Sequence, residues 1–145
     1  MTTITIRPYR STDSEALTLL MDDLGYPTKT EDMRKRMQKI ESLTDYHTFV
    51  AELEGIVAGM IGIREVYYYE GDGLVTQISL LVVKSDCQGQ GLGRALIRFV
   101  ERWAKQHGSS SLYLTSGMKP ERVRAHAFYE RNGFAKNGYR FVKSL

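Results

Sequence analysis

The chain has 145 residues, of which 42% are hydrophobic and 26% charged, with only three prolines. This composition is typical of a globular protein and excludes a disordered or fibrous one, and the length predicts a single domain over residues 1–145. The single cysteine, Cys87, excludes an internal disulfide and a cysteine-based metal site, which favours the cytoplasm. We expect no membrane association, because the sequence shows neither a secretory signal at its start nor an apolar run approaching the roughly 20 residues of a spanning helix.

The charge is mildly basic, at +3 from 20 basic and 17 acidic residues. Basic residues concentrate in 34–36, 94–105 and 119–131, all of which have helical patterns. They are explained either as solvated helix faces or as the surroundings of a phosphate-bearing ligand. Nucleic acid is not an expected partner, because no zinc-finger spacing, aromatic RNA-binding signature or long basic arm is present.

The first third of the chain predicts a strand and two helices. Apolar and polar residues alternate over residues 4–9, which indicates a half-buried strand. Helices are expected over 12–24 and 28–40, because each range begins with a threonine and has a glutamate three residues later, the spacing of a capping box.

The middle of the chain has the pattern of three antiparallel strands. These are expected at 48–53, 56–69 and 74–83, separated by turns that contain glycine. The last strand ends in a run, 78–83, with four successive apolar residues, which favours a central position buried on both faces.

The last third predicts a strongly amphipathic helix at 94–107, a short strand at 112–114, a helix at 121–132, and final strands at Phe134 and 139–142. The expected order is therefore β-α-α-β-β-β-α-β-α-β-β. This is a mixed α/β (α+β) fold.

A glycine-rich turn precedes the helix at 94–107 and reads Gln88-Gly89-Gln90-Gly91-Leu92-Gly93-Arg94. Backbone N–H groups of such a turn, together with the helix N-terminus, can bind a pyrophosphate; a tight turn with positive φ angles also explains the glycines. The phosphate loop of nucleotide hydrolases is excluded because no lysine follows Gly91, and the dinucleotide fingerprint because Arg94 replaces its third glycine.

Gln88, Gly91 and Gly93 match the Gln/Arg-x-x-Gly-x-Gly/Ala signature, so that the chain resembles the GNAT superfamily of acyl-CoA-dependent N-acyltransferases. Residues 127–134, Ala-Phe-Tyr-Glu-Arg-Asn-Gly-Phe, resemble a second element of that superfamily, and the expected order of elements is also similar. The resemblance implies a splayed mixed sheet. The segments at 124–129 and 139–143 resemble, more narrowly, aminoalkylphosphonate N-acetyltransferases.

The resemblance implies where acetyl-CoA, the cosubstrate, would bind. Backbone N–H groups of residues 88–94 would hold its pyrophosphate, and the exposed backbone of Leu81, Val82 and Val83 would pair with its pantetheine. A backbone N–H at Leu81 or Val82 would stabilise the charge that develops on the thioester oxygen. Phe128 and Arg131 would line the cofactor side, although Arg131 is equally explained as solvated helix surface.

Tyr129 is the expected proton donor to the departing thiolate, with a core aromatic as the alternative explanation. Many relatives carry a glutamate on the central strand, but residues 77–80 here are Gln-Ile-Ser-Leu. The remaining candidates for a general base are Glu65, Glu70 and Asp72, each also explained as a polar hairpin residue. Binding of an already neutral amine is a further possibility.

We therefore expect an N-acetyltransferase that acts by direct transfer on a small primary amine, such as an aminoalkylphosphonate, an amino sugar or a polyamine. The alternatives are a non-catalytic acyl-CoA-binding or regulatory module and a protein N-acetyltransferase. A homodimer is expected by analogy with the family. No metal is expected, because His47, His107 and His126 lack metal-ligand spacing. His126 adjoins the tyrosine motif, and residues 67–69, all tyrosines, either wall the acceptor pocket or alternate between strand faces.

Overall fold

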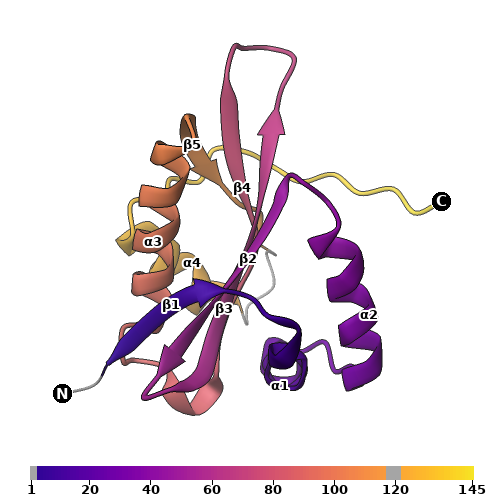
Figure 1. The fold of residues 1–145 in the computed structure, drawn as a ribbon. Helices are drawn as coiled ribbons and strands as arrows, with labels where there is room; N and C mark the ends of the chain where they lie inside the picture. Colours follow the sequence, from indigo (N-terminus) through magenta and orange to yellow (C-terminus); the bar gives the residue numbers. More distant parts are fainter. Residues whose placement is uncertain (1–2, 117–121) are drawn as a thin grey trace.

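The computed structural model describes residues 3–116 and 122–145. They form a five-stranded sheet with helices on both faces (Figure 1). The strands follow one another across the sheet in chain order, β1 (Ile4–Pro8), β2 (Tyr46–Leu53), β3 (Ile56–Tyr67), β4 (Leu74–Val83) and β5 (Ser109–Tyr113). Neighbouring strands are antiparallel except β4 and β5, which are parallel. The expected mixed α/β class and the antiparallel β2-β3-β4 unit are confirmed.

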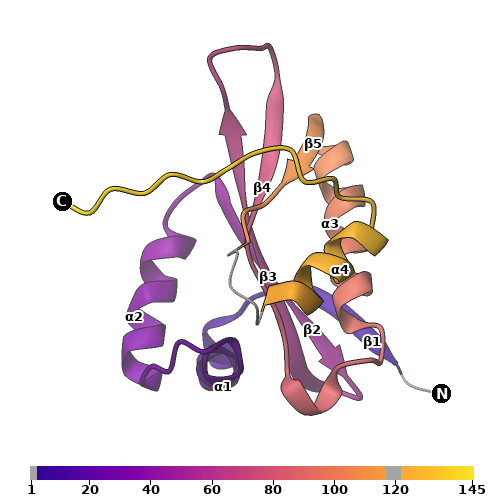
Figure 2. The ribbon, with the colours of Figure 1, turned by 180° about the vertical axis from the view of Figure 1, so that it is seen from behind.

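The helices divide between the two faces (Figures 1 and 2). One face carries α1 (Ser14–Leu24), which follows the short helix η1 (Ser11–Asp13), and α2 (Thr30–Glu41). The other carries α3 (Leu92–Gln106), which follows the short helix η2 (Ser85–Cys87), and α4 (Val123–Arg131). Among the described residues, no helix is long and apolar enough to cross a membrane.

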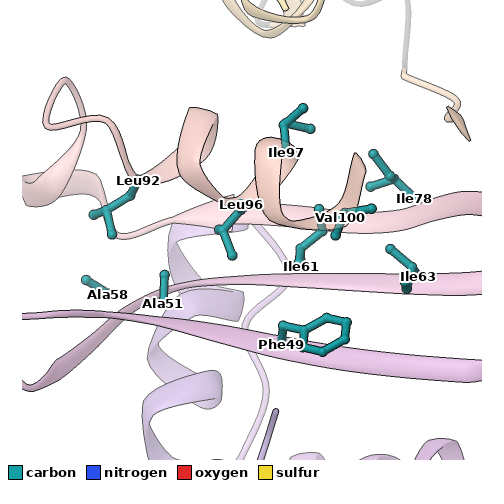
Figure 3. Packing of buried hydrophobic residues seen from close by; sticks show 10 residues of the cluster. All are labelled: Phe49, Ala51, Ala58, Ile61, Ile63, Ile78, Leu92, Leu96, Ile97 and Val100. Atoms are coloured by element: carbon teal, nitrogen blue, oxygen red, sulfur yellow. The ribbon is translucent and has the colours of Figure 1, made fainter. Parts of the chain in front are cut away.

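The sheet has one apolar cluster on each face, because successive side chains of a strand point to opposite sides. The α3 cluster contains Leu92, Leu96, Ile97 and Val100 packed on Phe49, Ala51, Ala58, Ile61, Ile63 and Ile78 (Figure 3). The α1–α2 cluster contains Leu17, Leu20, Met21, Met33 and Met37 packed on Val50, Met60 and Val82. Strand β4 contributes to both clusters, as expected for a central strand.

A bulge in β4 changes which residues face each cluster. Gly62 pairs with Leu80, but Ile63 pairs with Ile78, so Ser79 is an extra residue without a partner on β3. Such a bulge bends the strand and shifts its alternation by one residue. On the N-terminal side of this bulge, β4 pairs with β5 at Leu74, Thr76 and Gln77, and these are its only pairs with β5 among the described residues. In the described chain, the β4 edge from Ile78 to Val83 is therefore open on the β5 side, which is a splayed sheet.

The strands predicted at Phe134 and 139–142 are not formed. The chain beyond α4 has no strand, and it crosses the β5 edge of the sheet towards the α2 side (Figure 2). The Phe134 N–H donates to the Tyr129 carbonyl at 3.0 Å, so Phe134 closes the end of α4. Phe141, at 93% exposure, has no cluster to pack on. An alternating pattern predicts a strand only where a partner strand is available to complete its hydrogen bonds.

Neither predicted capping box forms. Thr12 lies inside η1, Thr28 lies two residues before α2, and no side chain in the described part of the chain caps α1 or α2. Instead, the buried Asp13 carboxylate accepts from the Arg10 backbone N–H and from the Arg7 guanidinium, both at 2.8 Å. Arg7 also donates to Glu52 at 2.8 Å. This ion-pair network joins η1 to β1 and β2.

Other boundaries differ by a few residues from the predictions. The helix predicted at 94–107 begins at Leu92, and the strand predicted at 56–69 ends at Tyr67. The strand predicted at 112–114 is β5, which begins three residues earlier. Residues 119–121 of the predicted basic segment and last helix lie outside the described residues.

Candidate active site

The glycines before α3 and in its first turn serve two different geometric needs. Gly89 and Gly91 have φ angles of +83° and +89°, and a Cβ on either would have no heavy atom within 4 Å. Both are therefore explained by backbone conformation. A Cβ on Gly93, in contrast, would lie 3.0 Å from the Phe128 ring, so this glycine allows α4 to approach the first turn of α3. The outer face of the turn is open.

The N-terminus of α3 has the properties of an anion site. Gly91 occupies the N-cap position, and no side chain of the described residues caps the helix. The first turn of any helix has backbone N–H groups without partners inside the helix and carries partial positive charge. Gln88, Gly89 and Gln90 are exposed beside it. This arrangement fits the pyrophosphate of CoA.

A basic groove of about 950 Å³ runs between α3 and the end of α4. Its lining includes Arg94, Arg98, Arg102, Lys105 and Arg131, and Glu101 is the one acidic residue among the described lining residues. The first three arginines are spaced by four residues and therefore share one helix face. Phe128 also lines this groove, beside Gly93. The basic segments at 94–105 and 122–131 thus lie side by side, which a solvated surface alone does not require.

The open edge of β4 lies next to this turn in the chain. Leu81, Val82 and Val83 pair with Ile61, Met60 and Gly59 of β3. Leu81 and Val83 pack against the α3 cluster, and Val82 belongs to the α1–α2 cluster. Since β5 does not pair with this part of β4, backbone groups on that edge are left for strand-like pairing with a ligand.

Tyr129 is half-buried on α4 between two aromatic rings. The centre of its ring lies 5.5 Å from the ring centre of Phe128 and 5.9 Å from that of Phe134, and both contacts are edge-on. Burial raises the pKa of the Tyr129 hydroxyl above 10.0, and the Arg122 guanidinium partly offsets this effect. The hydroxyl is therefore protonated at neutral pH and can donate a proton.

Arg122 is a residue that the sequence reasoning did not single out. Its guanidinium donates to the Ser116 hydroxyl at 3.3 Å and lies near enough to Tyr129 to affect its pKa. The only signal for it was its place in the basic segment at 119–131, which does not distinguish it from its neighbours.

The candidate bases are not gathered at Tyr129. The Glu65 carboxylate accepts from His47 Nε2 at 2.8 Å, and the His47 ring contacts Trp103 in the last turns of α3. Glu70 and Asp72 are exposed in the turn between β3 and β4, at the tip of a hairpin that projects away from α4 (Figures 1 and 2). The general base therefore has no carboxylate assigned by this geometry.

The other singled-out residues have structural explanations. The His107 Nδ1 lies 2.7 Å from the Trp103 carbonyl and its ring stacks on Trp103, so it ends α3 as expected. Cys87 is half-buried against the α3 cluster. His126 is half-buried on α4. Of the three successive tyrosines, only Tyr67 belongs to β3, and all three are exposed.

Comparisons with known proteins agree with this architecture. The acetyltransferase (GNAT) family matches residues 14–134. An aminoalkylphosphonate N-acetyltransferase from Salmonella typhimurium is 32% identical over 99 residues, which is 68% of this chain and 63% of that protein. The match thus spans less than two thirds of that relative.

Two solved structures share the whole fold. A GNAT family acetyltransferase from Staphylococcus aureus superposes with a TM-score of 0.85 at 29% identity and covers 99% of each chain. The aminoglycoside N-acetyltransferase AAC(6')-Iy in complex with CoA superposes with a TM-score of 0.84 at 18% identity, over 100% of this chain and 96% of that one. GNAT acetyltransferases use acetyl-CoA. The uncapped glycine turn, the open β4 edge and these matches together show that the chain belongs to the acetyltransferase (GNAT) family.

Proposed function

We propose that this protein transfers the acetyl group of acetyl-CoA directly to the primary amine of a small molecule. The observation that carries the proposal is the glycine turn at the uncapped N-terminus of α3, which follows the open edge of β4 after the short helix η2. Acetyl-CoA supplies the acetyl group as a thioester. The chain must then hold this substrate, stabilise charge on the thioester oxygen and provide a proton.

Backbone groups do most of the binding in this proposal. The N–H groups of residues 88–94 hold the pyrophosphate, while Leu81, Val82 and Val83 pair with the pantetheine as an added strand would. A backbone N–H at Leu81 or Val82 donates to the thioester oxygen as charge develops there. The basic groove between α3 and α4 attracts the remaining phosphate.

Tyr129 donates the proton that the leaving thiolate needs. Its raised pKa keeps the hydroxyl protonated, and its aromatic neighbours restrict the ring. For the acceptor, the amine either binds in its neutral form or loses its proton to water, because Gln77 and Ser79 occupy the stretch where relatives carry a glutamate. The nitrogen that has attacked the thioester then releases a proton to water, and the Tyr129 phenolate regains its proton from water, which completes the cycle.

The test is release of free thiol from acetyl-CoA in the presence of individual amines, with aminoalkylphosphonates, amino sugars, polyamines and a basic peptide as the panel. Amine-dependent release confined to one class of small molecule supports the proposal. Release with the peptide alone indicates a protein acetyltransferase instead. Binding of acetyl-CoA without any release indicates a binding module and contradicts catalysis.

We also propose a cytoplasmic homodimer. The exposed aromatic residues Tyr139 and Phe141 support the homodimer, because exposed apolar side chains of this size favour contacts with another protein surface. Light scattering coupled to size-exclusion chromatography measures the oligomeric state directly. A monomer at micromolar concentration contradicts the homodimer.

A further inference from the structure

Four polar side chains lie in a single row across the sheet, at the end of β5. Tyr46 of β2 pairs with Arg64 of β3, Arg64 pairs with Gln77 of β4, and Gln77 pairs with Tyr113 of β5. Directly paired residues of neighbouring strands point to the same side of a sheet. We call these four residues the cross-sheet row.

The cross-sheet row faces the α1–α2 side. Val50 and Met60 belong to the α1–α2 cluster. Tyr46 lies four residues before Val50 and Arg64 four residues after Met60, so each points to the same side of the sheet as that residue. Gln77 reaches this side because of the bulge at Ser79, since Ile78 next to it packs into the α3 cluster. Without the bulge, the alternation would place Gln77 with Leu81 on the opposite face.

Arg64 is a half-buried cation without a carboxylate. Among the described residues, its buried Nε has no hydrogen-bond partner, and no ion pair includes its guanidinium. The guanidinium carbon lies 6.0 Å from the centre of the Tyr46 ring. The hydroxyls of Tyr46 and Tyr113 raise the pKa of Arg64 despite its burial. A charged group held with an unsatisfied donor is costly unless something binds it.

The surroundings of Arg64 favour an anion with several oxygen atoms. A guanidinium presents five N–H donors in a rigid fork that suits phosphonate, phosphate and carboxylate groups. The Gln77 amide and the two tyrosine hydroxyls can add further donors. Tyr113 is 37% exposed, so solvent reaches this end of the row.

The cross-sheet row also lies at the point where β4 and β5 separate. Gln77 is the last β4 residue paired with β5, and Leu81 follows four residues later on the open edge. Because of the bulge at Ser79, these residues lie opposite Arg64 and Ile61, which are three residues apart on β3. At about 3.3 Å per residue, Gln77 and Leu81 are therefore separated by roughly 10 Å. A long side chain and a short aminoalkyl chain together span such a distance.

We propose that Arg64, supported by Tyr46, Gln77 and Tyr113, binds an anionic group of the acceptor, so that the preferred substrates are small amines with a phosphonate, phosphate or carboxylate. This inference rests on the proposed acetyltransferase function. It assigns the acceptor to the α1–α2 side of the sheet, across from α3 and the basic groove.

The test compares matched two-carbon and three-carbon amines with wild-type protein and with Arg64→Gln. The anionic acceptors are 2-aminoethylphosphonate, phosphoethanolamine and β-alanine, and ethanolamine is the uncharged comparator. We expect Arg64→Gln to lower kcat/KM for the preferred anionic amine about 10- to 100-fold, mainly through KM, since hydrogen bonds to charged groups contribute about 1.5–3 kcal/mol. The value for ethanolamine should be unchanged. The three anions also distinguish phosphonate, phosphate and carboxylate recognition.

Three further variants separate recognition from damage to the fold. Arg64→Lys keeps the charge but loses the fork, and should recover part of the lost kcat/KM. Tyr113→Phe removes one hydroxyl from the edge of the row and should raise KM only for the anionic amines. Arg34→Gln, at the exposed α2 residue that pairs with Glu31, should change neither kcat/KM nor KM for any of these amines.

The possible failures are distinguishable. If wild-type protein acetylates amines, but Arg64→Gln affects ethanolamine equally or affects no amine, the role of the cross-sheet row is wrong and the acetyltransferase proposal stands. If no amine is acetylated, titration calorimetry with 2-aminoethylphosphonate, phosphoethanolamine and β-alanine still decides. Binding of one of them that is lost in Arg64→Gln supports the row, and absence of binding to all three contradicts it.

Discussion

The ring of Phe128 on α4 lies directly against Gly93 in the first turn of α3. A Cβ on Gly93 would be 3.0 Å from the ring Cζ and 3.2 Å from Cε1, closer than ordinary van der Waals contact. This contact joins the two motifs that identify the family. It also lies next to the turn that we propose binds pyrophosphate, so a change there should affect both packing and binding.

We expect Gly93→Ala to lower the free energy of unfolding by about 1 kcal/mol, because an added methyl group forces the ring to move. Urea denaturation measures this effect. Gly93→Ala should cost less stability in the Phe128→Leu background than in the wild type, because the smaller side chain leaves room for the added methyl group. Gly91→Ala is a matched comparison, since its cost comes from a φ of +89° rather than from the ring. Equal rescue of both variants by Phe128→Leu would contradict the contact.

Tyr129→Phe should lower kcat by at least about 100-fold, the lower range for loss of a general acid, while the Kd for CoA stays the same. Steady-state thiol release and equilibrium binding measure the two quantities. Tyr26→Phe is the control, because Tyr26 is 70% exposed in the turn after α1.

The pH dependence gives a second readout of the same residue. Because burial raises the pKa of the Tyr129 hydroxyl above its ordinary value, the wild-type kcat should decrease at alkaline pH above that value, where the hydroxyl loses its proton. This alkaline decrease should be absent in Tyr129→Phe. An unchanged kcat in the variant would make Tyr129 a packing residue.

Removing positive charge from the basic groove should weaken CoA binding without changing kcat. We expect Arg98→Gln and Arg102→Gln each to raise the Kd for CoA about 2- to 5-fold, the range for exposed charge pairs, and to reduce its dependence on salt. Fluorescence or calorimetric titration at two salt concentrations measures this. Lys35→Gln on α2, outside the groove, should have no effect; a similar loss in that variant would indicate general charge attraction.

The ion pair between Arg7 and Asp13 should make the free energy of unfolding depend on pH in the acidic range. Arg7 holds the pKa of the buried Asp13 below its ordinary value of 3.8, so Asp13 contributes stability above that pH. The contribution decreases as the pH falls through the folded-state pKa, because the unfolded state then binds more protons. Urea denaturation from pH 7 to pH 3 should show a smaller decrease for Asp13→Asn than for wild type. Asp72→Asn, in the exposed hairpin turn, should retain the wild-type slope.

Removal of Arg7 should be more damaging than removal of an exposed charge. Arg7→Met leaves the buried Asp13 carboxylate without its cation, and we expect a loss of about 3 kcal/mol at pH 7. A loss below 1 kcal/mol would mean that Arg10 or solvent replaces the pairing.

Local patterns in the sequence were sufficient to predict the family and most of the helices and strands. The spacing of Gln88, Gly91 and Gly93 indicated the GNAT family, which the comparisons confirm, and the apolar stripe of α3 predicted the helix that buries Leu96 and Val100. Such a periodicity belongs to a single segment, because it depends only on the backbone preference of each residue and on the side of the helix or strand that the residue faces. Final strands at Phe134 and 139–142 were wrongly predicted for the same reason, because alternation describes a strand but not its partner.

Only the tertiary structure decided which distant residues meet. The bulge at Ser79 rotates Gln77 to the side of Arg64, and the short pairing of β5 opens β4 beside Leu81. Arg122 lies close enough to Tyr129 to act on its hydroxyl, although nothing in its own segment marks it. These relationships depend on register and packing between segments far apart in the chain, and a one-residue shift of register exchanges the faces of a strand.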